Sequence, residues 1–318
     1  MSNLDALLIT PPSRLEVYQG LANDYAAIEP PVWSSLIANY LIKKGYSAEV
    51  LDAEAENLTH EQTAEKIAKK KPKLAVFMVY GQQPSASTQC MPGGKKTCLK
   101  LNEISANEIK SIVIGTHASA LPKKTLEEEP YTYVCQGEGP ITVIELINFL
   151  KGKNKDLKKI PGLWYFDKDK KVNSNPSAKM FEDLDHNLPG QAWKLLDMKK
   201  YKAHNWHTFG RLETINSYAS LQTSLGCPFK CTFCCINAPF ERNTIRFWSP
   251  KHIIGQVKTL VEDYNITNIK IPDEMFVLNP KQVTGICDEI INSGYGKVLN
   301  FWAYARIDTL NDDEMLRK

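Results

Sequence analysis

Short apolar segments alternate with helical patterns over the first 150 residues, and this alternation constrains the fold more than any other feature. Five such segments are stopped by polar residues, glycine or proline, as strands are: 6–10, 48–52, 74–80, 111–115 and 131–135. Residues 74–80 (LAVFMVY) are apolar throughout, which is typical of a central parallel strand buried on both faces. The alternation predicts an α/β domain built on a doubly wound parallel sheet.

The alternation stops after Lys151 and resumes at Tyr218. Residues 152–216 read as an ordered connector with a hairpin at 160–172. Strands are then expected at 218–224, 268–271 and 300–305, with helices at 250–264 and 280–293. We therefore expect three parts: 1–151, 152–216 and 217–318. Three βα units are too few to close a barrel, so the last part is expected to be the first half of one.

Charge and hydropathy exclude several classes of protein. The chain has 39 basic and 36 acidic residues, a balance that does not suggest nucleic-acid binding. No apolar stretch approaches the length of about 20 residues that a membrane span needs. The N-terminus has no basic leader before its short apolar run, so a secretion signal is not expected. We expect a cytoplasmic protein, in which eight cysteines would not form a disulfide framework.

Four of the eight cysteines fall within nine residues, at positions 227, 231, 234 and 235. Cys227, Cys231 and Cys234 have the spacing C-x3-C-x2-C directly after a predicted strand. Three thiolates from one loop can hold three irons of a cubane cluster and leave the fourth open to a small molecule. The alternative is a structural zinc site with Cys235 or Cys287 as fourth ligand, although such sites usually pair their ligands in two separated halves.

This loop, with the aromatic Phe233 before the last cysteine, resembles the signature of the radical S-adenosylmethionine (SAM) superfamily. The resemblance implies a (β/α)6 barrel, a [4Fe–4S] cluster held by Cys227, Cys231 and Cys234, and SAM bound at the open iron. It also implies an electron donor such as flavodoxin or ferredoxin, and a small-molecule substrate.

Two further segments fit the same resemblance. The second barrel strand ends in Ile-Pro-Asp-Glu, where the superfamily carries a Gly-Gly-Glu-like motif that touches the SAM amino group. Asp273 or Glu274 is therefore a candidate partner for that ammonium, the alternative being solvated carboxylates at a strand end. Arg306, after the third strand, could form a two-pronged pair with the SAM carboxylate. Its alternative is a surface arginine beside Asp308.

The first domain resembles the cobalamin-binding domain, with a flavodoxin-like strand order, that precedes the barrel in one large radical SAM subgroup. Matching segments include Thr10-Pro11-Pro12, 51–53, 115–122 and 136–139. Ligands of doubly wound sheets lie beyond the carboxyl ends of the strands. The residues expected to contact cobalamin there are Thr10, Pro11, Gly81, Gly115, Thr116, His117, Ser119, Gly137 and Glu138.

The Asp-x-His-x-x-Gly motif, whose histidine ligates cobalt in other cobalamin proteins, is absent after the first strand. Its absence is usual in this subgroup, and some relatives keep the fold without holding a corrin. The resemblance implies a radical SAM enzyme, with cobalamin-dependent methyl transfer to an unreactive carbon as the leading expectation. The alternatives are a radical SAM enzyme without cobalamin, such as a catalyst of oxidative ring closure, and a non-catalytic protein that stores a cluster or senses a corrin.

Overall fold

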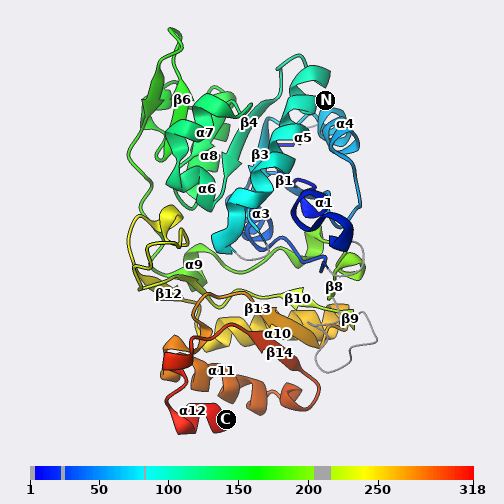
Figure 1. Ribbon diagram of the computed structural model, residues 1–318, viewed down its shortest axis with the longest axis vertical. Helices are drawn as coiled ribbons and strands as arrows, with labels where there is room; N and C mark the ends of the chain where they lie inside the picture. Colours follow the sequence, from blue (N-terminus) through cyan, green and yellow to red (C-terminus); the bar gives the residue numbers. More distant parts are fainter. Residues whose placement is uncertain (1–3, 23–25, 82–83, 204–215) are drawn as a thin grey trace.

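The computed structural model describes residues 4–22, 26–81, 84–203 and 216–318 (Figure 1). A seven-stranded sheet organises the first half of the chain, in the order β2-β1-β3-β4-β5-β6-β7. Its first five strands are parallel, while β6 and β7 add to the edge in antiparallel orientation. Their bounds are β1 Ala6–Thr10, β2 Ala48–Asp52, β3 Leu74–Met78, β4 Lys110–Ile114, β5 Tyr133–Cys135, β6 Leu163–Phe166 and β7 Val172–Ser174.

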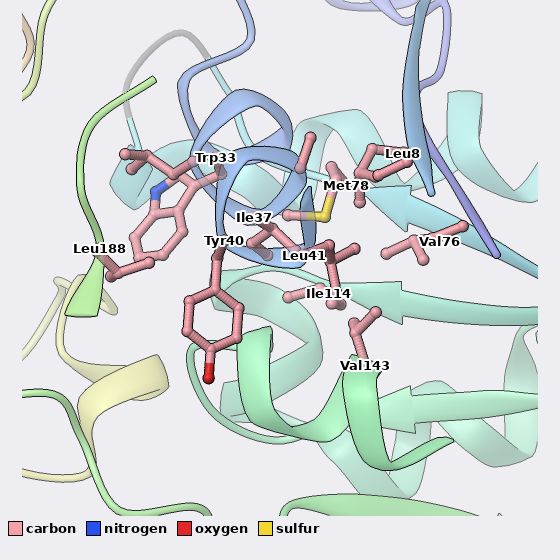
Figure 2. Close-up of a cluster of buried hydrophobic side chains, with 14 of the residues drawn as sticks. Leu8, Trp33, Ile37, Tyr40, Leu41, Val76, Met78, Ile114, Val143 and Leu188 are labelled. Carbon is pink, nitrogen blue, oxygen red and sulfur yellow. The ribbon is translucent and has the colours of Figure 1, made fainter. Parts of the chain in front are cut away.

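Helices cover both faces of this sheet, as the alternation of the sequence predicts. Side chains from α3 and α8 pack on one face of the sheet, and side chains from α4 and α5 pack on the other. Figure 2 shows the first face, where Ile37 and Leu41 of α3 meet Leu8, Val76 and Ile114 of the strands. The helix bounds are α1 Arg14–Tyr18, α3 Val32–Lys43, α4 His60–Lys70, α5 Met91–Ile104, α6 Thr116–Ala120, α7 Pro122–Glu128 and α8 Pro140–Leu150.

A smaller three-stranded parallel sheet, in the order β10-β13-β14, forms the second domain. It lies at the lower end of the molecule in Figure 1, together with α10 and α11. A separate antiparallel pair, β11 and β12, lies beside it. The bounds are α9 Leu184–Asn187, β8 Lys202–Ala203, β9 Asn216–Ser217, β10 Ala219–Ser220, β11 Ser224–Gly226, β12 Ile245–Phe247, α10 Pro250–Tyr264, β13 Asn268–Ile271, α11 Pro280–Asn292, β14 Asn300–Ala303 and α12 Asp313–Arg317.

The expected fold class is confirmed, and two details of the prediction are wrong. The single strand expected at 218–224 is two short strands, because the backbone leaves β10 before Gln222 and re-pairs with β12 from Ser224 onward. The hairpin assigned to the connector belongs to the first sheet, since β6 pairs with β5. None of the described helices combines the length and apolar character that crossing a bilayer requires.

The two domains share one hydrophobic core. The cluster that contains Leu8 and Ile37 of the first domain continues through Leu225, Val257 and Ile269 of the second. Figure 2 shows Trp33 and Tyr40 of α3 facing Leu188, which follows α9. Since burial of apolar surface is the main favourable term in packing, the second domain is fixed against the first.

Candidate functional site

A cavity lies beyond the carboxyl ends of β1, β2 and β3, where the first domain meets the second. It contains about 900 Å³ of empty space, including the part open to solvent. In a sheet of this order the crossovers change direction between β1 and β3, and ligands of doubly wound folds bind at such a point. The lining includes Thr10, Asp52, Glu54, Tyr80 and Gly81 at the strand ends, 30–34 at the start of α3, and Gln222 and Pro272 from the second domain.

Three acidic side chains belong to this lining: Glu29, Asp52 and Glu54. Glu54 accepts a hydrogen bond from the backbone N–H of Arg14 (2.6 Å) and pairs with the guanidinium at 3.5 Å, which holds the first turn of α1 at the cavity. Burial raises the pKa of Asp52 to about 7. Its Oδ1 accepts hydrogen bonds from the backbone N–H groups of Glu54 and Ala55. The wall thus offers a carboxyl group that can carry a proton near neutral pH, and so can donate as well as accept.

The structure divides the nine predicted cobalamin residues into two groups. Thr10 and Gly81 line the cavity, and Pro11 is buried directly after β1. Thr10 Oγ1 lies 3.1 Å from Ser34 Oγ at the start of α3. The other six lie outside the cavity lining that the described residues form, at or after the ends of β4 and β5: Gly115, Thr116, His117, Ser119, Gly137 and Glu138.

Members of this second group bond to neighbouring loops of the protein. Ser119 Oγ accepts a hydrogen bond from the backbone N–H of Gly137 (3.2 Å). His117 Nδ1 lies 2.9 Å from Thr88 Oγ1, and burial lowers the pKa of this histidine. A neutral imidazole held in this way is a local structural contact, and its contact with cobalamin stays a prediction.

Glu138 takes part in a buried ion pair with the second domain. Its Oε1 lies 2.7 Å from Nη2 of Arg246 on β12, and both side chains are almost fully buried. Arg246 also donates to the carbonyl of Phe181 (2.6 Å). Since a buried charge needs a partner, this pair anchors β12 to the loop after β5.

The cysteine loop follows β11, and Asn237 holds its two ends together. Asn237 Oδ1 accepts from the backbone N–H of Cys227 (3.0 Å), and Nδ2 donates to the carbonyl of the same residue (2.7 Å). Cys227 is buried, Cys231 is exposed and Cys234 lies between these extremes; burial raises the pKa of the Cys227 and Cys234 thiols. Phe233 is 92% exposed. The loop therefore presents its thiols at different depths.

The donor set of this loop fits an iron–sulfur cluster in its chemistry. None of the eight cysteines, all within the described residues, forms a disulfide. Besides burial, the charge of Cys231 raises the pKa of the Cys227 thiol and the charge of Cys227 raises that of the Cys234 thiol, so these side chains are neighbours. Over the described ranges, no group of three or more His, Cys, Asp and Glu side chains is close enough to hold a metal ion. The three thiols therefore share a loop but do not converge on one point.

Asp273 and Glu274, the two candidates for the SAM ammonium, have different positions. Asp273 is buried and accepts hydrogen bonds from Thr223 N (2.8 Å), Thr223 Oγ1 (2.6 Å) and Ser224 Oγ (2.6 Å). Burial raises its pKa to about 6. Glu274 lines a smaller cavity next to Gly226, and its charge raises the pKa of the Cys227 thiol. Glu274 is therefore the better placed candidate, while Asp273 ties β13 to β11.

Arg306 lies over the cysteine loop. Its guanidinium carbon is 4.1 Å from the centroid of the Phe229 ring. Its Nε and Nη2 donate to the two carboxylate oxygens of Asp308, at 2.9 and 2.7 Å. The side chain is therefore in reach of the loop, but its two-pronged donor face is occupied by Asp308. A SAM carboxylate would have to displace that partner.

Trp33 and Gln222 lie between two cavities and line both of them. The smaller cavity, with about 270 Å³ of empty space including the part open to solvent, is lined by Trp33, Gln222, Ser224, Leu225, Gly226, Ile236, Phe240 and Glu274. Trp33 and Gln222 also line the larger cavity, so they separate the sheet-end cavity from the one beside the cysteine loop. Neither residue was predicted as a site residue from the sequence. In the sequence, Trp33 is one more apolar position of a helix. The only sign of a role for Gln222 is its position shortly before the cysteine loop.

Comparison with known proteins agrees with this geometry. Residues 18–147 match the B12 binding domain family. The whole chain superposes on the cobalamin-dependent SAM radical enzyme OxsB, solved with aqua-cobalamin and SAM, with a TM-score of 0.71 and 18% identity over 98% of this chain and 40% of OxsB. The radical SAM methyltransferase TsrM of Kitasatospora setae gives a TM-score of 0.67 at 17% identity over 96% of this chain and 55% of TsrM. Residues 18–147 thus resemble a B12 binding domain, and the chain shares the fold of these solved radical SAM enzymes.

Among curated proteins, the chain is similar to an uncharacterized methyltransferase of Pyrococcus horikoshii, with 27% identity over 98% of this chain and 62% of the relative. It is also similar to the anaerobic magnesium-protoporphyrin IX monomethyl ester cyclase of Cereibacter sphaeroides, with 24% identity over 94% of this chain and 46% of the cyclase. The chain therefore spans only about half to three fifths of the length of these relatives.

Proposed function

We propose that this chain binds cobalamin in the sheet-end cavity and a [4Fe–4S] cluster with SAM at the cysteine loop, and that it acts in radical SAM catalysis. One observation carries the proposal: the two cavities share Trp33 and Gln222 as a common wall. Two cofactors bound on either side of that wall would be close enough to act on one substrate. When bound, the cluster supplies an electron to SAM and the corrin carries a methyl group.

Different residues of the chain would bind the cluster, SAM and the corrin. Cys227, Cys231 and Cys234 would hold the cluster, as three thiolates from one loop can. Glu274 would face the SAM ammonium, and Arg306 would exchange Asp308 for the SAM carboxylate. Thr10, Gly81 and Asp52 would contact the corrin from the strand ends.

Methyl transfer to an unreactive carbon of a small molecule is the reaction we favour. Support comes from the B12-binding domain, because a corrin is a methyl carrier. A relative named as a methyltransferase points in the same direction. Ring closure, the reaction named for the cyclase relatives, is the second candidate. The proposal includes a flavodoxin or ferredoxin as electron donor and a cytoplasmic location, where a reducing environment keeps thiols free.

The decisive test is formation of 5′-deoxyadenosine from SAM. Protein reconstituted anaerobically with iron and sulfide, then reduced, is expected to form this product and to contain about four irons per chain. The variant Cys231→Ala should contain less iron and form none. Zinc in place of iron, or normal iron without 5′-deoxyadenosine, would contradict the proposal. Visible absorption of the anaerobically purified protein separates the cobalamin-dependent reading from the cobalamin-free one.

A further inference from the structure

Gln222 occupies a singular position between the two cavities. It lies in the short segment between β10 and β11, where the chain leaves one sheet and enters the next. Its side chain is only 9% exposed, yet it lines both the sheet-end cavity and the cavity beside the cysteine loop. Its neighbours along the chain have structural tasks, since Thr223 and Ser224 both donate to Asp273.

The side-chain amide of Gln222 uses its donor group but not its acceptor. Nε2 donates to the carbonyl of Ser224 at 2.9 Å, and this bond fixes the orientation of the amide. Oε1 is buried and has no hydrogen-bond partner among the described residues. A buried acceptor left without a donor is costly, and such atoms in folded proteins usually await a water or a ligand. Gln222 Oε1 is therefore available to accept a hydrogen bond from a ligand at the boundary of the two cavities.

We propose that Gln222 Oε1 is a ligand-binding group that accepts a hydrogen bond from an N–H donor of a bound cofactor. Two donors have this chemistry: a primary amide at the edge of a corrin in the sheet-end cavity, and the ammonium of SAM beside Glu274. This inference rests on the proposed function and deepens it. It assigns a binding residue to the wall that both cofactors share.

The charges around Gln222 are compatible with either donor. Glu274 lines the smaller cavity with it and would attract an ammonium. Asp52 and Glu54 line the larger cavity and are hydrogen-bond acceptors that suit an amide-rich ligand. Neutral Gln222 can serve both sides without adding a further negative charge to the wall.

The test compares Gln222→Met with the wild-type whole chain. Methionine has a similar length and shape but no strong acceptor, so the variant should weaken the affinity for one ligand by about two- to tenfold. One arm titrates apo-protein with aqua-cobalamin and follows the visible absorption. The other titrates the reduced, reconstituted protein with SAM and follows the magnetic resonance signal of the cluster. Weakening in the first arm identifies the corrin amide, and weakening in the second identifies the SAM ammonium.

Gln191→Met is the matched control. Gln191 is 5% exposed, and both atoms of its side-chain amide also have no partner among the described residues, but it lines neither cavity. Its variant should leave both affinities unchanged. If Gln222→Met does not fold, Gln222→Leu also removes the acceptor and should weaken the affinity for the same ligand by a similar factor. A Gln222→Met protein that binds both ligands as tightly as wild type would overturn the inference alone. A wild-type protein that binds neither would overturn the proposed function with it.

Discussion

Glu29 and Lys270 form a buried ion pair, with 2.6 Å between Oε1 and Nζ, although 241 positions separate them in the sequence. Glu29 precedes α3 and lines the sheet-end cavity, whereas Lys270 lies on β13 of the second domain. The ammonium also lies over the rings of Trp302 and Tyr304, at 5.3 and 5.7 Å from their centroids. Pro272, which directly follows β13, lines the same cavity. The pair therefore fixes both walls of the cavity at once.

Removing Lys270 should destabilise the protein strongly. Lys270→Met leaves Glu29 buried without its cation, and the expected loss in free energy of unfolding is about 3 kcal/mol. The double variant Glu29→Gln with Lys270→Met should recover most of this loss, because no buried charge remains. Urea unfolding followed by circular dichroism measures both. Lys258→Met, which breaks the exposed pair with Glu262, should cost less than about 0.5 kcal/mol.

The protonation of Asp52 should make stability depend on pH. Burial raises its pKa from the ordinary 3.8 to about 7 in the folded chain. Between these values the folded state holds a proton that the unfolded state has released, so the free energy of unfolding falls as the pH rises. The slope should approach about 1.4 kcal/mol per pH unit at most. Asp52→Asn, which cannot ionise, should lose this part of the pH dependence and be more stable than wild type above pH 7.

Urea midpoints measured from pH 4.5 to 8 would check this prediction. Asp273, whose pKa is also raised by burial, contributes a similar decline in both proteins. The difference between wild type and Asp52→Asn isolates Asp52. Parallel curves for the two proteins would show that its carboxyl group is ionised throughout this range.

The cysteine loop should distinguish Cys234 from its neighbour Cys235. Cys234→Ser removes a member of the C-x3-C-x2-C set and should reduce the iron content of reconstituted protein well below about four per chain. Cys235→Ser changes a residue outside that set and should retain wild-type iron. Iron and sulfide analysis with visible absorption measures both variants. If both variants lose the same amount of iron, Cys235 is also a metal ligand, as in the alternative of a four-ligand zinc site.

Gly115 should not tolerate a side chain. A Cβ atom there would lie 2.2 Å from the carbonyl oxygen of Val79, because the residues that follow β3 and β4 approach each other closely. Gly115→Ala should cost about 1–3 kcal/mol of stability through this overlap. The control is Gly255→Ala on α10, where no other atom lies within 4 Å. Alanine in that helix should stabilise the protein by up to about 1 kcal/mol. Thermal unfolding of both variants tests the contrast.

The order of strands and helices could be predicted because it depends on local patterns of apolar, polar and turn-forming residues. Residues 6–10, 48–52 and 268–271 are strands with the bounds that the apolar runs predict. The segment at 218–224 was mispredicted because its break depends on partners elsewhere. Thr223 N donates to Asp273, and Thr223 O accepts from Trp248, so neither group extends β10.

The candidate site was predictable only in part. The spacing of the cysteines identifies their loop, since three ligands on one short segment need no tertiary information. The same sequence left Asp273 and Glu274 equivalent, and only burial beneath Thr223 and Ser224 separates them. Of the predicted cobalamin residues, Thr10 and Gly81 line the cavity, whereas Glu138 is occupied by Arg246.

By itself the sequence determined the sheet-and-helix alternation and the thiol loop, because side-chain periodicity and ligand spacing act between residues close along the chain. The tertiary structure alone decided that Glu29 meets Lys270, that Glu138 meets Arg246, and that Trp33 and Gln222 stand between the two cavities. Those contacts join segments more than 100 residues apart. The stabilisation comes from apolar packing and from charge pairs that offset each other's desolvation, and both need surfaces that meet only when both domains have folded.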